Sequence, residues 1–212
     1  MKLPKSWSDV TIETFLKYYT ISTRKWVDPI DQEINILACF SGQDVKEIEK
    51  LKARELADYI KKLSFLSKLP SGRVKKEFNV GGGHYYAQLV MQEMTAAQFM
   101  NFSDLLKGVK QEDYIYQMHN LIACMCTKRT YQMKYPFIKY EYDGYLKNSD
   151  VFYKNMTMDL AYPFYVFFCK VMDKSLANIQ DYLTQVLKKE QKEIKKSSRK
   201  KRWALGSIGV GI

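Results

Sequence analysis

The sequence predicts a mainly α protein: a helical, bundle-like body with one β-hairpin, then a long C-terminal helix that leads into an extended tail. Three observations support this fold class. Apolar residues recur at helical spacing along most of the chain. One glycine run, Gly81–Gly83, separates two strand-like segments. Residues 188–212 carry a dense block of basic side chains followed by an apolar end that contains glycines.

The first 70 residues are expected to form a cluster of helices. Apolar residues at helical spacing predict a helix over 11–21, with Asp9 or Thr11 available as its N-cap. Another short helix is expected to begin at 44–45, and a longer one is expected to run up to Pro70. The longer one is marked by Leu56, Ile60, Leu63 and Leu66.

The second helix of this cluster has the clearest boundaries. Asp28 is a capping residue, Pro29 suits the first helical position, and acidic side chains follow in the positive first turn. Gly42 is expected to end the helix. Its predicted apolar stripe consists of Ile30, Ile34, Leu37 and Ala38.

A change of period after residue 70 predicts a β-hairpin. The segments 74–80 and 84–90 suit strands, and the glycines between them supply the positive φ angles that a tight turn needs. We expect this hairpin to be the only sheet element. A phosphate-binding loop is disfavoured, because such loops space their glycines apart and lie between a strand and a helix.

Three more helices are expected after the hairpin. One begins at an N-cap, Thr95, and ends before Gly108, and the next spans Glu112–Lys128. The third is the long C-terminal helix, capped by Asp159, with Pro163 in its first turn.

A Tyr-rich loop, residues 130–149, separates these last two helices. No single period holds there, so the segment is predicted to be a long ordered loop, alone or with a short helix. Tyrosine is common at protein interfaces, and aromatic rings beside lysines also suit base stacking. We assign three of its residues as candidate docking residues: Tyr135, Tyr140 and Tyr142.

The pattern divides the chain into three parts. These are an N-terminal helical cluster (1–70), a core of hairpin and helices that includes the Tyr-rich loop (71–187), and the tail (188–212).

The net charge of +11 is concentrated in the tail. Residues 188–202 hold nine basic and two acidic side chains, which makes that segment +7. The basic residues are Lys188, Lys189, Lys192, Lys195, Lys196, Arg199, Lys200, Lys201 and Arg202. A protein that coats DNA over its whole surface is therefore not expected.

Three interpretations of the basic segment remain open. It is a solvated helix end, a non-specific phosphate contact, or a segment that docks on an acidic protein surface. The apolar end favours docking over phosphate binding, because binding to phosphates does not require an apolar segment. Its candidate docking residues are Trp203, Leu205, Ile208, Val210 and Ile212.

No residue pattern indicates an enzyme, a metal or a cofactor. His119 lies near Cys124 and Cys126, but the spacing does not match a structural zinc site, and no residue marks a thiol as activated. The four cysteines are interpreted as reduced and buried. The start of the chain lacks the apolar core of a signal peptide, and no apolar run reaches the roughly 20 residues of a membrane span.

Several segments together resemble a known group of viral proteins. They are residues 7–15 (WSDVTIETF), 28–42 (DPIDQEINILACFSG), the short helix at 44–51, and 80–106 (VGGGHYYAQLVMQEMTAAQFMNFSDLL). Their layout over residues 7–130 resembles small proteins encoded in the tail and assembly region of tailed bacteriophages.

The resemblance implies a non-enzymatic role in virion building. The protein would be a tail-assembly chaperone or a structural component near the portal and tail, with other phage proteins as partners and with a homo-oligomeric ring as one form. It would act in the host cytoplasm during assembly or remain in the virion. The alternative is a nucleic-acid-binding accessory protein that uses residues 188–202.

Overall fold

The computed structural model describes residues 1–131, 138–142 and 144–171. Residues Met1–Val166 form one compact unit, and Phe167–Ile212 form a second one. Only residues 167–171 of the second unit are among those described. The predicted boundary near residue 70 lies inside the first unit. The mainly α fold class is confirmed.

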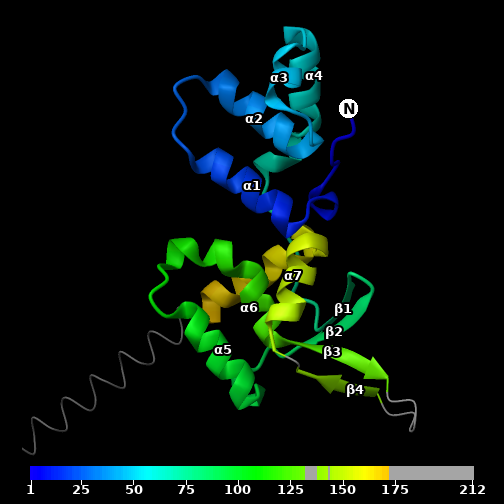
Figure 1. The fold of residues 1–212 in the computed structure, drawn as a ribbon, viewed down its shortest axis with the longest axis vertical. Helices are drawn as coiled ribbons and strands as arrows, with labels where there is room; N and C mark the ends of the chain where they lie inside the picture. The colour runs from blue at the N-terminus through cyan, green and yellow to red at the C-terminus, as the bar shows by residue number, and fades with distance from the viewer. Residues whose placement is uncertain (132–137, 143, 172–212) are drawn as a thin grey trace, which may run out of the picture. The chain divides into compact units, whose positions relative to one another are not determined.

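The N-terminal helices form where the sequence predicts them (Figure 1). The side chain of Thr11 accepts a hydrogen bond from the Thr14 amide, and that of Asp28 accepts one from Ile30. Gly42 ends its helix in the left-handed conformation, with φ at 69°. The elements are η1 (Trp7–Asp9), α1 (Ile12–Thr23), α2 (Pro29–Ser41), α3 (Val45–Glu49), α4 (Ala53–Lys62) and η2 (Ser64–Ser67).

Two details of this cluster differ from the prediction. The helix expected to run to Pro70 ends at Lys62, and a 3-10 turn follows it. Proline disfavours the α conformation in the residue before it, which prevents the helix from continuing to residue 69. Ile30 is 54% exposed and Ile34 is half-buried, so only Leu37 and Ala38 of the predicted stripe are buried.

An aromatic core holds the N-terminal helices together. The ring of Trp7 lies 5.8 Å from that of Phe15 and 5.3 Å from that of Phe65, both in edge-to-face geometry. Tyr18 and Phe40 join α1 to α2 at 5.4 Å. Such pairs add about 0.5–1.5 kcal/mol each beyond the burial of their area.

The sheet is larger than the predicted hairpin. Strands β1 (Glu77–Val80) and β2 (Gly83–Ala87) form that hairpin, which is confirmed. The turn residues Gly81 and Gly82 both have positive φ, at 55° and 74°. Two further strands, β3 (Cys126–Tyr131) and β4 (Ile138–Glu141), extend the sheet in the antiparallel order β1-β2-β3-β4.

The prediction that the hairpin is the only sheet element is therefore wrong. The helix predicted to reach Lys128 ends at Met125, and the Tyr-rich loop supplies part of β3, all of β4 and the start of α7. The free edge of β2 explains the change, because Tyr86 pairs with Thr127 and Ala87 pairs with Cys126. Tertiary pairing of this kind overrides a weak local helical pattern.

The remaining helices follow the hairpin in the chain, and two of them, α6 and α7, contact the sheet. They are η3 (Met91–Glu93), α5 (Ala96–Leu106), η4 (Gln111–Gln117), α6 (Met118–Met125) and α7 (Leu146–Asn155), followed by helical residues 158–171. Helix α6 contacts both α5 and α7 (Figure 1), and six of its eight residues are buried. The first part of the predicted helix Glu112–Lys128 is the 3-10 helix η4.

The start of the C-terminal helix also differs from the prediction. Residues 158 onward are helical, so Asp159 lies inside the first turn instead of capping it. Pro163 is the sixth helical residue and lies in the second turn. The Thr157 carbonyl accepts the first backbone hydrogen bonds of the helix, from the amides of Leu160 and Ala161. The predicted continuation to residue 187 and the tail lie outside the described residues.

A second aromatic core joins the sheet to the helices. Phe78 and Tyr85 are cross-strand partners with stacked rings 5.9 Å apart. Phe152 of α7 and Phe164 pack on them at 4.8–5.9 Å. The two cores are linked through the backbone, because the Ile12 amide donates to the Met156 carbonyl.

Candidate protein-docking surface

Most of the predicted docking and phosphate-contact residues lie outside the described part of the chain. This holds for Tyr135, for the basic residues of 188–202 and for the apolar end residues Trp203, Leu205, Ile208, Val210 and Ile212. The backbone of Tyr140 lies in β4 and pairs with Arg129 of β3.

Tyr142 has an internal role in the described structure. Its hydroxyl accepts a hydrogen bond from Asn101 Nδ2 at 2.8 Å, and it also bonds to the Cys124 thiol. Burial raises the pKa of Tyr142 to about 12, against the opposing effect of the Asn101 bond. The side chain therefore joins α5 and α6 to the end of β4, and its hydroxyl is used within the chain.

The histidines and buried cysteines form no reactive centre among the described residues. Burial raises the pKa of Cys124 to about 12 and that of Cys126 well above its usual value, so both thiols stay protonated. Burial lowers the pKa of His119, whose ring lies 5.1 Å from that of Tyr153. Within the same part of the chain, no group of three or more histidine, cysteine and acidic side chains is placed to hold a metal ion.

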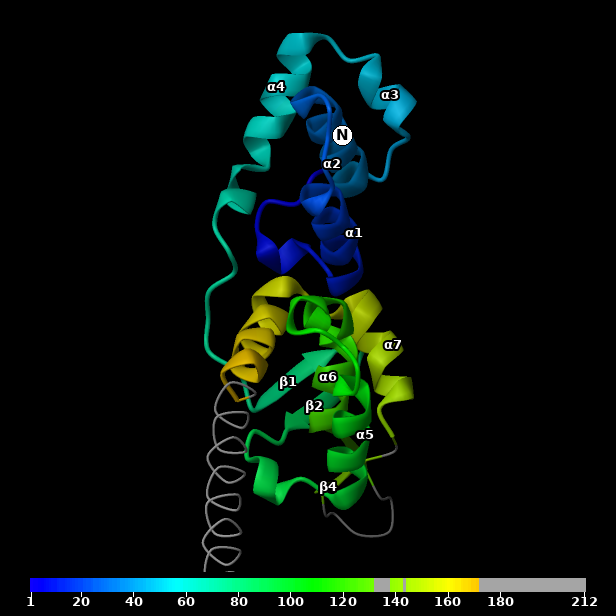
Figure 2. The ribbon, with the colours of Figure 1, turned by 90° about the vertical axis from the view of Figure 1, so that its left-hand side faces the viewer.

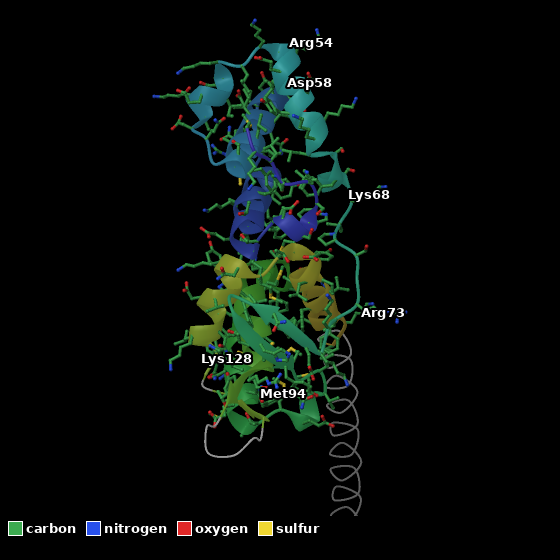
Figure 3. The ribbon with its side chains drawn as sticks, turned by 90° about the vertical axis from the view of Figure 1, so that its right-hand side faces the viewer. Arg54, Asp58, Lys68, Arg73, Met94 and Lys128 are labelled. Atoms are coloured by element: carbon green, nitrogen blue, oxygen red, sulfur yellow. The ribbon has the colours of Figure 1, made fainter. Side chains whose placement is uncertain are left out.

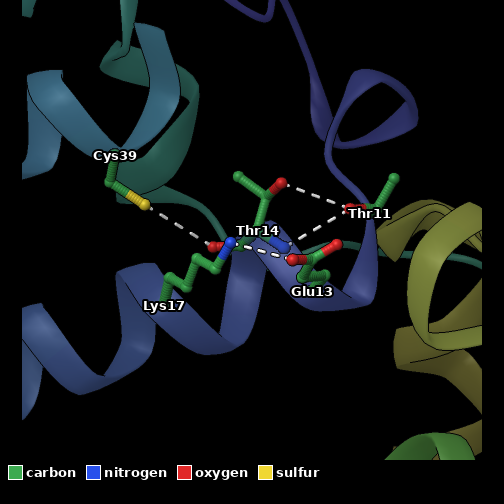
Figure 4. Close-up of polar contacts among 5 residues, drawn as sticks. All are labelled: Thr11, Glu13, Thr14, Lys17 and Cys39. Atoms are coloured by element: carbon green, nitrogen blue, oxygen red, sulfur yellow. Dashed lines mark hydrogen bonds and ion pairs between the residues drawn. The ribbon is translucent and has the colours of Figure 1, made fainter. Parts of the chain in front are cut away.

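Cys39 lies at the contact between α1 and α2 (Figure 4). Its thiol is 3.8 Å from the Thr14 carbonyl oxygen, to which it donates. Burial raises the pKa of Cys39, although the nearby Lys17 opposes that shift. The Lys17 ammonium is 2.8 Å from the Glu13 carboxylate. The raised pKa of this hydrogen-bonded thiol is the opposite of the lowered pKa that activates a cysteine nucleophile.

A cavity of about 650 Å³ opens between the sheet and α7. Its lining brings together Lys128 of β3, Glu141 of β4 and Lys147 of α7. No histidine or cysteine is among its described lining residues.

A groove of about 400 Å³ lies among α1, α2 and the α4–η2 segment. Its apolar lining residues are Tyr18, Ile36, Ile60, Leu63 and Leu66. The last three are among the residues that marked the predicted helix; Leu63 is buried and the other two are partly exposed. The groove belongs to the N-terminal cluster and has a mainly apolar character.

Two pairs of exposed apolar residues were not predicted as contact points. Phe99 is 50% exposed and Met100 is 63% exposed, next to each other on α5. Val27 is fully exposed and Ile30 is 54% exposed at the start of α2. A signal for the first pair was present, because the apolar residues of the segment 98–106 lie on more than one side of a helix and one helix buries only one of its faces.

Comparisons with known proteins identify no relative. No protein-family model matches the chain. No curated protein and no solved structure matches it either. Among the described helices, none is long and apolar enough to cross a membrane.

Proposed function

We propose that this protein is a non-enzymatic component of phage virion assembly that acts by docking on other proteins of the portal–tail region. The phage context comes from the resemblance of residues 7–130. The docking mechanism is supported by one observation above all: the exposed pair Phe99 and Met100 on α5.

The geometry of α5 explains why Met100 stays exposed. Gln98 and Phe102 lie one turn apart, are 2% and 3% exposed, and define the buried face of the helix. Each helical residue advances by about 100°, so Met100 lies about 200° away from Gln98, on the opposite face. Capping by Thr95, whose hydroxyl accepts from the Gln98 amide at 3.2 Å, fixes this orientation.

Burial of Phe99 and Met100 by a partner protein would be energetically favourable. Each square ångström of apolar surface removed from water contributes about 25 cal/mol, and aromatic and methionine side chains are enriched in interface cores. The second pair, Val27 and Ile30, lies on a different element, at the start of α2. Two separate apolar points favour docking at several positions on a rigid helical body.

Paired substitutions on α5 test this proposal in a phage that encodes the chain. The variant Phe99→Ser/Met100→Ser is expected to fold normally but to lower the particle yield by about tenfold or more, which corresponds to a docking free energy weaker by at least about 1.4 kcal/mol. The matched control Ala96→Ser/Ala97→Ser changes two exposed residues of the same helix and is expected to leave the yield unchanged.

Thermal unfolding of both variants separates loss of docking from loss of fold. Normal particle yield from a folded Phe99→Ser/Met100→Ser variant would overturn the proposal. Mass spectrometry of purified wild-type particles then distinguishes the two roles. A fixed copy number identifies a structural component, and absence from the particle identifies an assembly chaperone.

A further inference from the structure

The charge of the described body is concentrated in one segment. Residues 61–76 carry six basic side chains and no acidic one, and we call this stretch the anchored basic segment. Its cations are Lys61, Lys62, Lys68, Arg73, Lys75 and Lys76. Residues 1–60 hold nine basic and ten acidic side chains, so they are nearly neutral. The anchored basic segment is thus a second centre of positive charge, separate in sequence from residues 188–202.

The six cations share one kind of surroundings. All six are exposed, and none forms an ion pair with a carboxylate among the described residues. Lys62 lies over the ring of Tyr59, at 4.7 Å. Some lysines elsewhere do pair with a nearby acidic side chain, as Lys50 does with Glu47. The anchored basic segment therefore presents positive charge that the described chain does not neutralise.

The backbone of the anchored basic segment is held in place at several points. The Trp7 indole donates to the Lys68 carbonyl at 2.7 Å, and the Ala87 amide donates to the Lys76 carbonyl at 2.7 Å. Between these bonds, Pro70 is buried, and Gly72 lies against Pro163, so close that an added Cβ would be 3.4 Å from the proline ring. Figure 2 shows the segment passing from α4 to β1 beside the helix that contains Pro163.

This anchoring aims the cations outward. Figure 3 shows the side chains of Lys68 and Arg73 extending away from the body on the same side. Because the backbone is already ordered, the conformational entropy lost when a ligand binds here comes mainly from the side chains. Residues 68–76 span at most about 29 Å, a length that about eight to nine base pairs of duplex cover.

We propose that the anchored basic segment binds the phosphate backbone of a nucleic acid without reading its sequence. Serial lysine and arginine side chains neutralise phosphates and release counterions. An acidic protein partner fits less well, because protein interfaces have an apolar core and Leu69 is the one large apolar side chain exposed in this segment. This inference goes beyond the docking function and does not depend on it.

Fluorescence anisotropy of the full chain with a labelled DNA duplex tests the proposal. The variant Lys68→Gln/Arg73→Gln/Lys75→Gln/Lys76→Gln removes four charges from the anchored basic segment. It is expected to bind at least about tenfold more weakly at about 100 mM salt. The slope of its salt dependence should be lower by about 0.9 for each phosphate that the variant no longer neutralises.

The matched control removes the same charge elsewhere. The variant Lys17→Gln/Lys50→Gln/Lys107→Gln/Lys154→Gln changes four exposed, ion-paired lysines, so it lowers the net charge equally. We expect its affinity to fall by less than about threefold, because distant charges are screened at this salt concentration.

Three results would overturn the proposal. The first is an equal fall in affinity in both variants, which would indicate a general field effect. The second is unchanged affinity in the variant of the anchored basic segment, which would place any duplex binding elsewhere. The third is tighter binding of polyglutamate than of duplex, abolished in that same variant, which would identify an acidic protein as the partner. Thermal unfolding confirms that both variants fold.

Discussion

At the scale of single residues, one part-buried polar contact joins Asn101, Tyr142 and Cys124. Asn101 donates to the Tyr142 hydroxyl, and that hydroxyl bonds to the Cys124 thiol. Burial raises the pKa of both the phenol and the thiol to about 12. Both groups are therefore neutral and act as hydrogen-bonding groups of the core, not as acids or nucleophiles.

These shifts predict that the protein loses stability at alkaline pH. The ordinary pKa values are 9.0 for the thiol and 10.0 for the phenol, and the folded state holds both protons more tightly than the unfolded state. Their contribution is complete below pH 9 and disappears as the pH rises from 9 toward 12. Urea unfolding across this range is expected to show a falling free energy of unfolding.

The variant Cys124→Ala checks the assignment of this pH effect. It removes one of the raised groups, so its free energy of unfolding should fall less steeply between about pH 9 and 11 than that of the wild type. An equally steep decline would show that other groups cause the alkaline loss.

At the scale of elements, the hairpin turn shows how local and tertiary constraints meet at one position. Both Gly81 and Gly82 adopt a left-handed conformation that favours glycine. Only Gly81 is also packed, since a Cβ there would lie 2.6 Å from Cγ1 of Val151 in α7. A Cβ added at Gly82 would have no neighbouring atom within 4 Å. The two positions therefore separate the conformational cost of a side chain from its packing cost.

Alanine substitutions at these positions are expected to differ in their effect on stability. Gly82→Ala should cost about 1–2 kcal/mol, the penalty of the left-handed conformation for a residue with a Cβ. Gly81→Ala should cost about 1–3 kcal/mol more, because the new methyl group overlaps Val151. Urea unfolding measures both, and adding Val151→Ala should recover part of the loss only in the Gly81 variant. Equal costs at both glycines would contradict the packing argument.

At the scale of the whole molecule, the net charge divides between two segments and a nearly neutral remainder. The anchored basic segment contributes +6 and residues 188–202 contribute +7 to the total of +11, so the other residues sum to −2. One of the two segments belongs to the compact unit Met1–Val166 and the other does not. A test of tail function must therefore leave residues 61–76 intact.

Deletion of residues 197–212 is the matching whole-molecule prediction. The deletion is expected to leave the fold intact, because both aromatic cores lie within residues 7–164. The unfolding temperature should stay within about 2 °C of the wild type, a change of about 1 kcal/mol or less. Particle assembly should be abolished if the apolar end docks on a neighbouring subunit. Normal assembly by the truncated chain would refute that role.

The sequence by itself determined the features that a few neighbouring residues satisfy. The caps at Thr11, Asp28 and Thr95, the stop at Gly42 and the turn at Gly81 and Gly82 all formed as predicted. In each case the hydrogen bond or the backbone angle involves residues within about one helical turn of each other, so the signal is complete within a short window.

Only the tertiary structure decided the features that depend on distant residues. Cys126–Tyr131 is a strand because the edge of β2, far earlier in the chain, supplies its hydrogen bonds. The Tyr142 hydroxyl is internal because Asn101 lies next to it in space. The exposure of Phe99 and Met100 depends in the same way on where α6 lies. Pairing and burial are set by contacts across the fold, and a local pattern of residues does not contain them.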